Sequence, residues 1–188
     1  MFTVSTSKYH HGDLRHGLIK AGRALLCDHG VAGLTLRATA REAGVSATAA
    51  YRHFADKEAL LTAIAADGFV ALETALRAAD DHPDDRTAMR QQGVAYVQFA
   101  IANPNLVRLM FGGVIHQDGI GQAAFAVLAH RVAQCVGPEN AETVTLGAWS
   151  IVHGLTALIL DQRIKTNDPA ALAAKILALL DLTRPSTC

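Results

Sequence analysis

Residues 35–57, TLRATAREAGVSATAAYRHFADK, decide the fold of the N-terminal part of this chain of 188 residues. The stretch predicts two short helices separated by a tight turn and followed at once by a longer helix. Thr35 is the expected N-cap of the first helix, because its hydroxyl can accept an otherwise unpaired N–H of the first turn. Gly44 is expected to end that helix, since the residue after a helix end often needs a left-handed backbone that glycine adopts at little cost. Ser46 is the next expected N-cap, and residues 47–52 form a helix of less than two turns.

A helix this short is not stable alone, so neighbouring elements must hold it in place. Ala50 and Phe54 on its inner side are expected to make that contact. The other side carries Ala47, Thr48, Tyr51 and Arg52. Small and hydrogen-bonding side chains on an exposed helix, with cations alongside, suit the major groove of DNA.

Several motifs occur here in a defined order: Thr35-Leu36-Arg37, Ala43-Gly44-Val45-Ser46, Tyr51-Arg52-His53-Phe54 and Lys57-Glu58-x-Leu60-Leu61, preceded by Tyr9-His10-His11-Gly12-Asp13-Leu14-Arg15. Over about the first 60 residues they resemble the helix-turn-helix of TetR-family transcriptional regulators. Trp149-x-x-x-His153-Gly154 is similar to a tryptophan-histidine-glycine (WHG-type) element of one subgroup of the family's C-terminal domains. The resemblance implies an all-helical homodimer that binds a near-palindromic operator in double-stranded DNA, as a repressor that a small molecule releases.

The resemblance also implies which residues contact DNA. Arg37 would reach a guanine edge or a phosphate, and Thr48 would contact base edges. The full predicted set is Thr35, Arg37, Ser46, Ala47, Thr48, Ala49, Tyr51, His53 and Lys57. A structural alternative stays open, in which Tyr51 and His53 simply pack the head. Two residues depart from the family pattern: Ala50 replaces a larger aliphatic residue, and Arg52 replaces an aromatic one.

Composition agrees with an all-helical chain, since 51% of residues are apolar but only 5% are aromatic. The formal net charge is zero but unevenly spread. Residues 1–57 contain eight Lys/Arg against four Asp/Glu, and residues 58–188 contain nine against thirteen. A basic head on a neutral chain indicates polyanion binding by the head, although chance asymmetry would explain the split almost as well.

The sequence predicts about nine helices in two domains. The head is expected at residues 1–57, extending to about residue 72 with the start of a long helix capped by Asp56, and a ligand-binding and dimerisation domain at residues 58–188. The expected helices span residues 13–29, 35–43, 47–52, 57–80, a stretch ending near 102, 105–111, 117–136, 139–165 and 169–182. The acidic segment 80–85 is predicted to be a solvated loop, because adjacent aspartates cannot all converge on one metal ion.

The predicted ligand pocket is apolar with a few polar groups, the usual composition of a small-molecule site. Its candidates are Tyr96, Phe99, Met110, Phe111, Phe125, Trp149 and His153. The last two helices are expected to form the homodimer, through Val144, Ala148, Ile151, Val152, Leu155 and Leu158. For both sets the alternative is ordinary packing in the core of the domain. The effector is expected to be a small apolar or amphipathic molecule of unknown identity.

Other classes of function are less favoured. No nucleophile with a base, no paired carboxylates and no metal-ligand spacing are evident, so we expect no catalytic residue, metal or cofactor. Residues 143–160 are uncharged, but their polar residues favour a bundle helix over a membrane span. A cytoplasmic protein without a signal peptide is expected, with Cys27 buried as a thiol. The competing class is a helical homodimer that binds small molecules or proteins without DNA.

Overall fold

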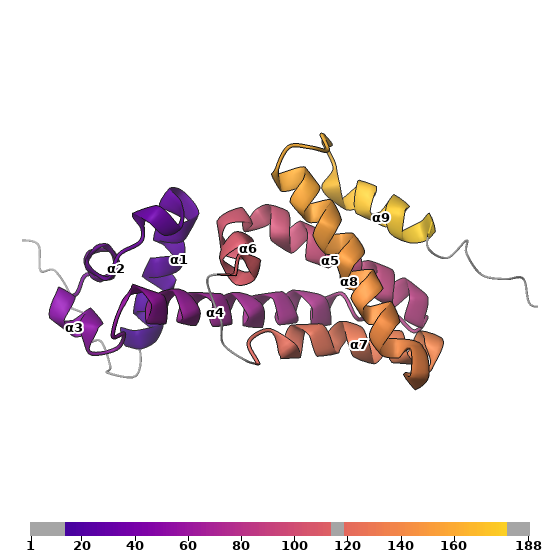
Figure 1. Ribbon diagram of the computed structural model, residues 1–188, viewed down its shortest axis with the longest axis horizontal. Helices are drawn as coiled ribbons and strands as arrows, with labels where there is room; N and C mark the ends of the chain where they lie inside the picture. Colours follow the sequence, from indigo (N-terminus) through magenta and orange to yellow (C-terminus); the bar gives the residue numbers. More distant parts are fainter. Residues whose placement is uncertain (1–13, 114–118, 180–188) are drawn as a thin grey trace, which may run out of the picture.

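The computed structural model describes residues 14–113 and 119–179. Within these ranges the chain forms nine α-helices and no strand, which confirms the all-α class (Figure 1). The helices are α1 (Leu14–Gly33), α2 (Leu36–Glu42), α3 (Ala47–Tyr51), α4 (Lys57–Ala78), α5 (Asp85–Ala102), α6 (Pro104–Phe111), α7 (Gln122–Val136), α8 (Pro138–Leu160) and α9 (Pro169–Leu179). The first three gather around one end of α4, and the later helices pack along the rest of it.

The head forms around a small core built from the apolar faces of α1 to α4. Leu18, Leu36 and Phe54 are buried in it, while Leu25 and Val45 are half-buried. Ile19 and Leu26 of α1 are also buried in this core. Gly30 (φ 64°) interrupts α1, so the straight part of the helix ends where the sequence predicted.

α4 is the element shared by the head and the C-terminal helices. Asp56 caps it, since Oδ1 accepts the Ala59 N–H at 2.8 Å. Its 22 residues span about 33 Å at the usual helix rise. Along this length α4 contacts α1 near its start and α5, α6 and α7 further on. The boundary near residue 57 stays a prediction, because one continuous buried cluster runs from the head into the C-terminal helices.

Two polar contacts join the head to the C-terminal helices. The guanidinium of Arg23 on α1 binds the carboxylate of Asp67 on α4 at 2.6 Å. Asn105 at the start of α6 donates to the carbonyl oxygens of Leu26 (3.1 Å) and Cys27 (2.9 Å). The thiol of Cys27 is exposed, which corrects the expected burial: Leu26 uses the inward position, and the next residue is turned by about 100°.

Several helix ends differ from the prediction. α3 ends at Tyr51, one residue early, and Arg52 is its C-cap. α7 begins at Gln122 rather than residue 117, after Gly121 in a left-handed conformation (φ 90°). α8 ends at Leu160 rather than residue 165, where Gln162 (φ 57°) turns the chain back. The predicted ends of the first helix at residue 13 and the last at residue 182 lie outside the described residues.

By length and composition alone, α4 and α8 are each apolar enough to cross a membrane. α4 is surrounded by the head and by α5, α6 and α7, which is the setting of a core helix in a soluble bundle. α8 contacts α5, α7 and α9 with one side, and its other side carries exposed apolar residues. The exposed side of α8 therefore needs a further explanation.

Candidate functional site

The short helices of the head are defined by two side-chain caps and one glycine. The Thr35 hydroxyl oxygen accepts the Ala38 N–H at 3.1 Å, and the Ser46 hydroxyl oxygen accepts the Ala49 N–H at 3.2 Å. Between them Gly44 adopts φ 69°, and the Val45 N–H returns to the Ala40 carbonyl at 2.9 Å. These interactions set the angle between α2 and α3, as the sequence predicted.

The inner side of α3 is anchored in the head. Ala50 is fully buried and Phe54 is 3% exposed, so both predicted clamping residues pack as expected. The Arg15 guanidinium lies 5.3 Å from the centre of the Phe54 ring, a cation–π contact between α1 and the residues after α3. Ala50 is smaller than the aliphatic residue of the family pattern at this position, but α3 still packs against its neighbours.

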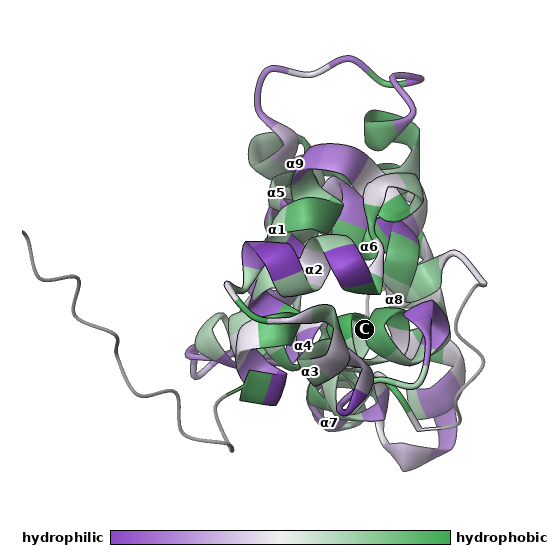
Figure 2. Cartoon of the chain, turned by 90° about the vertical axis from the view of Figure 1, so that its left-hand side faces the viewer, coloured by the Kyte–Doolittle hydropathy of each residue, from purple (hydrophilic) through white to green (hydrophobic). Residues whose placement is uncertain are grey.

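The outer side of α2 and α3 faces away from the protein. Seen from the head end (Figure 2), both helices lie in front, and α2 carries hydrophilic residues. Arg37, Thr48 and Arg52 are exposed, and Tyr51 is 50% exposed, so its ring is not packed in the head. Ala47, Ala49 and His53 are half-buried. This face is small, polar and cationic, and no other described segment covers it.

Lys57 is the one predicted contact residue that binds the protein's own backbone through its charged group. Its Nζ donates to the Val31 carbonyl at 2.6 Å, and the side chain is half-buried. An ammonium has three donors, so this bond leaves the others for a phosphate. The phosphate contact stays a prediction, and the structure adds a role for Lys57 in joining α4 to the end of α1.

A cavity of about 690 Å³ lies among the C-terminal helices. Its wall combines residues of α4, α5, α6, α7, α8 and α9, and it is mainly apolar and aromatic. Five of the predicted candidates line it: Tyr96, Met110, Phe111, Phe125 and Trp149. The volume is in the range of cavities that bind small organic ligands.

Phe99 and His153 do not line the cavity. Phe99 is half-buried beside the end of α5, where its carbonyl accepts the Asn103 side-chain amide at 2.9 Å. His153 packs against Phe111, with ring centres 4.9 Å apart, and its Nδ1 is 2.8 Å from the Tyr96 hydroxyl. His153 therefore contacts the aromatic residues of the wall without lining the cavity itself.

Burial determines the protonation of this Tyr96–His153 pair. It raises the pKa of Tyr96 to about 12, and the nearby Trp149 side chain offsets only part of that effect. It also lowers the pKa of His153 below its usual value. Near pH 7 the tyrosine is thus protonated and the histidine neutral, so the hydroxyl can donate to Nδ1.

Sequence reasoning missed several cavity residues. Phe69, Leu72 and Leu76 of α4 were not among the predicted pocket residues, and they form one wall of the cavity. Gln92 of α5 was not singled out at all, although it is 1% exposed and lines the cavity. The only indication in the sequence was that Gln92 is a polar residue among the apolar positions of α5. Which face of α5 lies against the cavity depends on the packing of several helices.

Comparison with known proteins decides the family. The sequence profile described as "Bacterial regulatory proteins, tetR family" matches residues 18–64, and that described as "Tetracyclin repressor-like, C-terminal domain" matches residues 89–180. Together they cover most of the chain, including both the helix-turn-helix and the cavity helices. The chain belongs to the TetR family of DNA-binding transcriptional regulators.

Individual relatives agree with this assignment. An HTH-type transcriptional regulator of Mycobacterium tuberculosis is 35% identical over 101 residues, covering 52% of this chain and 43% of the relative. The match thus spans less than half the length of this curated relative. A solved protein with unknown function from Rhodococcus sp. RHA1 is 33% identical, with a TM-score of 0.79 over 92% of this chain and 96% of the other. A putative transcriptional regulator from Pseudomonas aeruginosa PAO1 shares the fold, with 21% identity and a TM-score of 0.72 over 95% and 93% of the chains.

This TetR-family chain exposes an apolar stripe on α8. Leu146 is 46% and Leu158 is 45% exposed. Gly147 and Gly154 lie on the same side, and a Cβ added to either would meet nothing within 4 Å. Of the residues predicted to pair with a second copy, Val152 and Leu155 are instead buried in the protein's own core, and Ala148 lines the cavity. The prediction mixed the two faces of one helix, because both faces are apolar.

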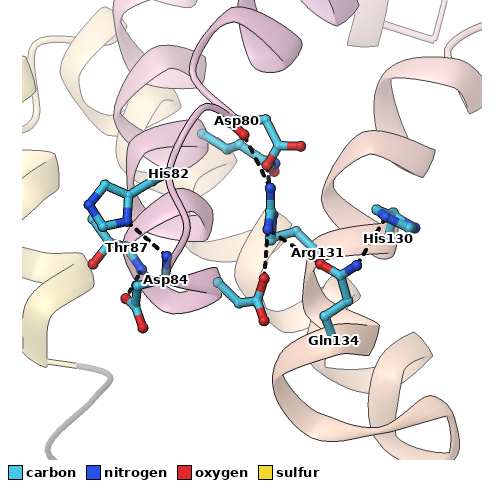
Figure 3. Close-up of polar contacts among 9 residues, drawn as sticks. Asp80, His82, Asp84, Thr87, His130, Arg131 and Gln134 are labelled. Atoms are coloured by element: carbon cyan, nitrogen blue, oxygen red, sulfur yellow. Dashed lines mark hydrogen bonds and ion pairs between the residues drawn. The ribbon is translucent and has the colours of Figure 1, made fainter.

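In the acidic segment after α4, Asp81 and Asp84 are exposed in a loop, as expected, whereas Asp80 and Asp85 are bound by Arg131. Arg131 of α7 binds Asp80 through Nε at 2.8 Å (Figure 3). It also binds Asp85 through Nη1 at 2.6 Å. Its Nη2 also donates to the Asp80 carbonyl at 3.1 Å. This contact ties the end of α4 to the start of α5 and to α7, beside the cavity. This contact could not be predicted from the sequence, because Arg131 lies 51 residues from Asp80.

Proposed function

We propose that this protein is a homodimeric repressor that binds a near-palindromic DNA operator and is released by a small molecule bound in the C-terminal cavity. The observation that carries the DNA half is the exposed outer face of α2 and α3, whose inner side Ala50 and Phe54 anchor. Because α3 is already held in place, it does not have to become ordered when it enters the major groove.

The predicted contacts divide by chemistry. Thr48 and Arg37 are exposed and are assigned to base edges, while the hydroxyls of Thr35 and Ser46 lie at helix N-termini and are assigned to phosphates. Ala47 and Ala49 permit a close approach, and Tyr51, His53 and Lys57 are assigned to the backbone. Because the target is DNA, we assign the protein to the cytoplasm.

The exposed stripe on α8 supports a homodimer. Gly147 and Gly154 are two turns apart and leave open space, so a second helix can approach closely beside Leu146 and Leu158. A two-fold dimer would carry two copies of α3, which a palindromic operator requires. α9 contributes the exposed Leu179 at 60% exposure.

The cavity supports control by an effector. Its wall includes α4, which begins in the head, so a ligand that changes the position of α4 also changes the position of α3. The effector needs only a few kcal/mol of preference for the released state to shift the balance.

The test of DNA binding starts from selection of a preferred sequence out of random duplexes, followed by anisotropy titrations. Thr48→Glu places a carboxylate on the exposed outer face of α3 and should weaken operator binding at least about tenfold. Thr74→Glu makes the same change at an exposed position on α4 and should leave binding unchanged. If wild-type protein selects no sequence and shifts no duplex, the helical module without DNA binding becomes the better description.

A further inference from the structure

One polar side chain of the cavity wall contains a buried atom without a hydrogen-bond partner. Gln92 is 1% exposed and lines the cavity, and its Oε1 is unpaired. Among the described residues the only other buried side-chain atom in this state is Thr156 Oγ1, which is not part of the wall. A buried acceptor without a partner is costly, and in native proteins it commonly marks a place where a further molecule binds.

The orientation of the Gln92 amide is fixed by its neighbour. Its Nε2 donates to Asp80 Oδ1 at 2.6 Å. A carboxylate only accepts hydrogen bonds, so the NH₂ group must face Asp80 and the oxygen must lie on the other side. Asp80 is held in turn by Arg131, 2.8 Å away (Figure 3). Gln92 therefore offers a bound molecule an acceptor and not a donor.

The rest of the wall offers rings and few polar groups. Phe69 and Phe111 meet edge to face with centres 5.2 Å apart, and Phe125 and Trp149 do so at 6.2 Å. The Tyr96 hydroxyl is already paired with His153. Among the described residues no carboxylate lines the cavity, so this part of the wall offers a ligand cation no counter-charge, and its one cation, Arg90, donates through Nη2 to the Thr87 hydroxyl at 3.1 Å. Such a surface suits an uncharged ligand that contains a ring.

We propose that the effector is an uncharged, ring-containing apolar molecule with one hydroxyl group that donates a hydrogen bond to Gln92 Oε1. The inference rests on the proposed effector role of the cavity and names its ligand class. Because Oε1 is buried, the hydroxyl reaches it after a small movement of a neighbouring side chain. An ether or a carboxylate at the same place would bring an acceptor against an acceptor.

Three probes of similar shape test the proposal: para-tert-butylphenol, para-tert-butylanisole and para-tert-butylbenzoate. Trp149 is the only tryptophan of the chain and lines the cavity, so its fluorescence reports occupancy directly, and calorimetry gives a second reading. The phenol should bind wild-type protein at least roughly tenfold more tightly than the anisole, and the benzoate more weakly than the phenol.

Two variants assign this preference to Gln92. Gln92→Met keeps the length of the side chain and removes the acceptor, so the phenol and the anisole should then bind within about twofold of each other. Gln98→Met makes the same change on the exposed side of α5 and should keep the wild-type preference. Thermal melting checks that both variants are folded, and Gln92→Leu replaces Gln92→Met if the latter is not.

The possible outcomes distinguish a wrong ligand class from a wrong assignment of the cavity as an effector site. Equal binding of phenol and anisole to wild-type protein would overturn the ligand class while leaving an effector cavity in place. An undiminished preference in Gln92→Met would overturn the role of Gln92. If none of the probes changes the Trp149 fluorescence or releases heat, the effector cavity itself is refuted, and this inference falls with it.

Discussion

The ammonium of Lys57 donates a hydrogen bond of 2.6 Å to the carbonyl oxygen of Val31. The first residue of α4 is thereby bound to the end of α1, close to the face assigned to DNA. A charged donor at this position both orders the head and carries a positive charge toward a phosphate. These two roles can be measured separately.

Lys57→Ala should lower the free energy of unfolding by about 1–2 kcal/mol, because the half-buried Val31 carbonyl loses a charged donor. It should also weaken binding to all duplexes alike and reduce the salt slope of binding by about one. Urea unfolding and anisotropy across salt concentrations measure the two effects. Lys20→Ala removes an exposed cation from α1 as a control, and a loss confined to the preferred sequence would contradict the phosphate role.

Arg37→Ala should weaken operator binding by about 1–3 kcal/mol if its guanidinium reads a base edge. The side chain is exposed, so stability should change little. Titration against the selected operator and against a scrambled duplex distinguishes base reading from phosphate contact. A base contact predicts a loss on the operator alone, whereas unchanged affinity for both duplexes would remove Arg37 from the interface.

Leu158→Arg should convert the proposed homodimer to monomers by raising the dimer dissociation constant roughly a hundredfold or more, because the new charge would be buried without a partner. Sedimentation measures the change, and operator affinity should fall with it. Val70→Arg is the matched control, since Val70 is an apolar residue on α4 that is 62% exposed. A stable Leu158→Arg dimer would place the interface elsewhere.

His153 should make stability depend on pH below neutrality. Burial lowers its pKa in the folded protein, so the unfolded chain binds a proton more readily as the pH falls below about 6.5. The free energy of unfolding should therefore decrease from about pH 7.5 to about pH 5.5. His153→Gln keeps an acceptor for Tyr96 and should flatten this dependence in urea titrations. Parallel pH profiles for variant and wild type would rule out the histidine as the source.

Arg131→Met should destabilise the protein by about 1–3 kcal/mol, because it leaves Asp80 and Asp85 without their shared cation. The Arg131 side chain is 16% exposed, so solvent screens part of the interaction. In the double variant with Asp80→Asn the combined loss should be smaller than the sum of the single losses. Strict additivity in urea unfolding would show that the two residues are not coupled.

The helix-turn-helix was predictable because its determinants are local. Thr35, Ser46 and Asp56 each cap a helix with an atom three residues away, and Gly44 supplies one left-handed residue. Such features depend on only a few neighbouring residues, so the order of the residues fixes them. The inward positions of Ala50 and Phe54 follow from the same short period.

The two faces of α8 could not be separated from the sequence. Val152 and Leu155 are buried, while Leu146 and Leu158 are exposed, yet all four are apolar. Periodicity identifies a buried face only when the opposite face is polar. Where both faces are apolar, the packing of α5, α7 and α9 alone decides which one the protein covers.

The sequence by itself determined the family, the helix order and the head, since these depend on caps, turns and motifs within short stretches. Only the tertiary structure decided that Asp80 is joined to Arg131 and Gln92, and that the Gln92 oxygen is left unpaired beside a cavity. These contacts join residues of α5 and α7 to the loop that follows α4. Their partners are set by how helices pack together, a property that no single stretch of the chain encodes.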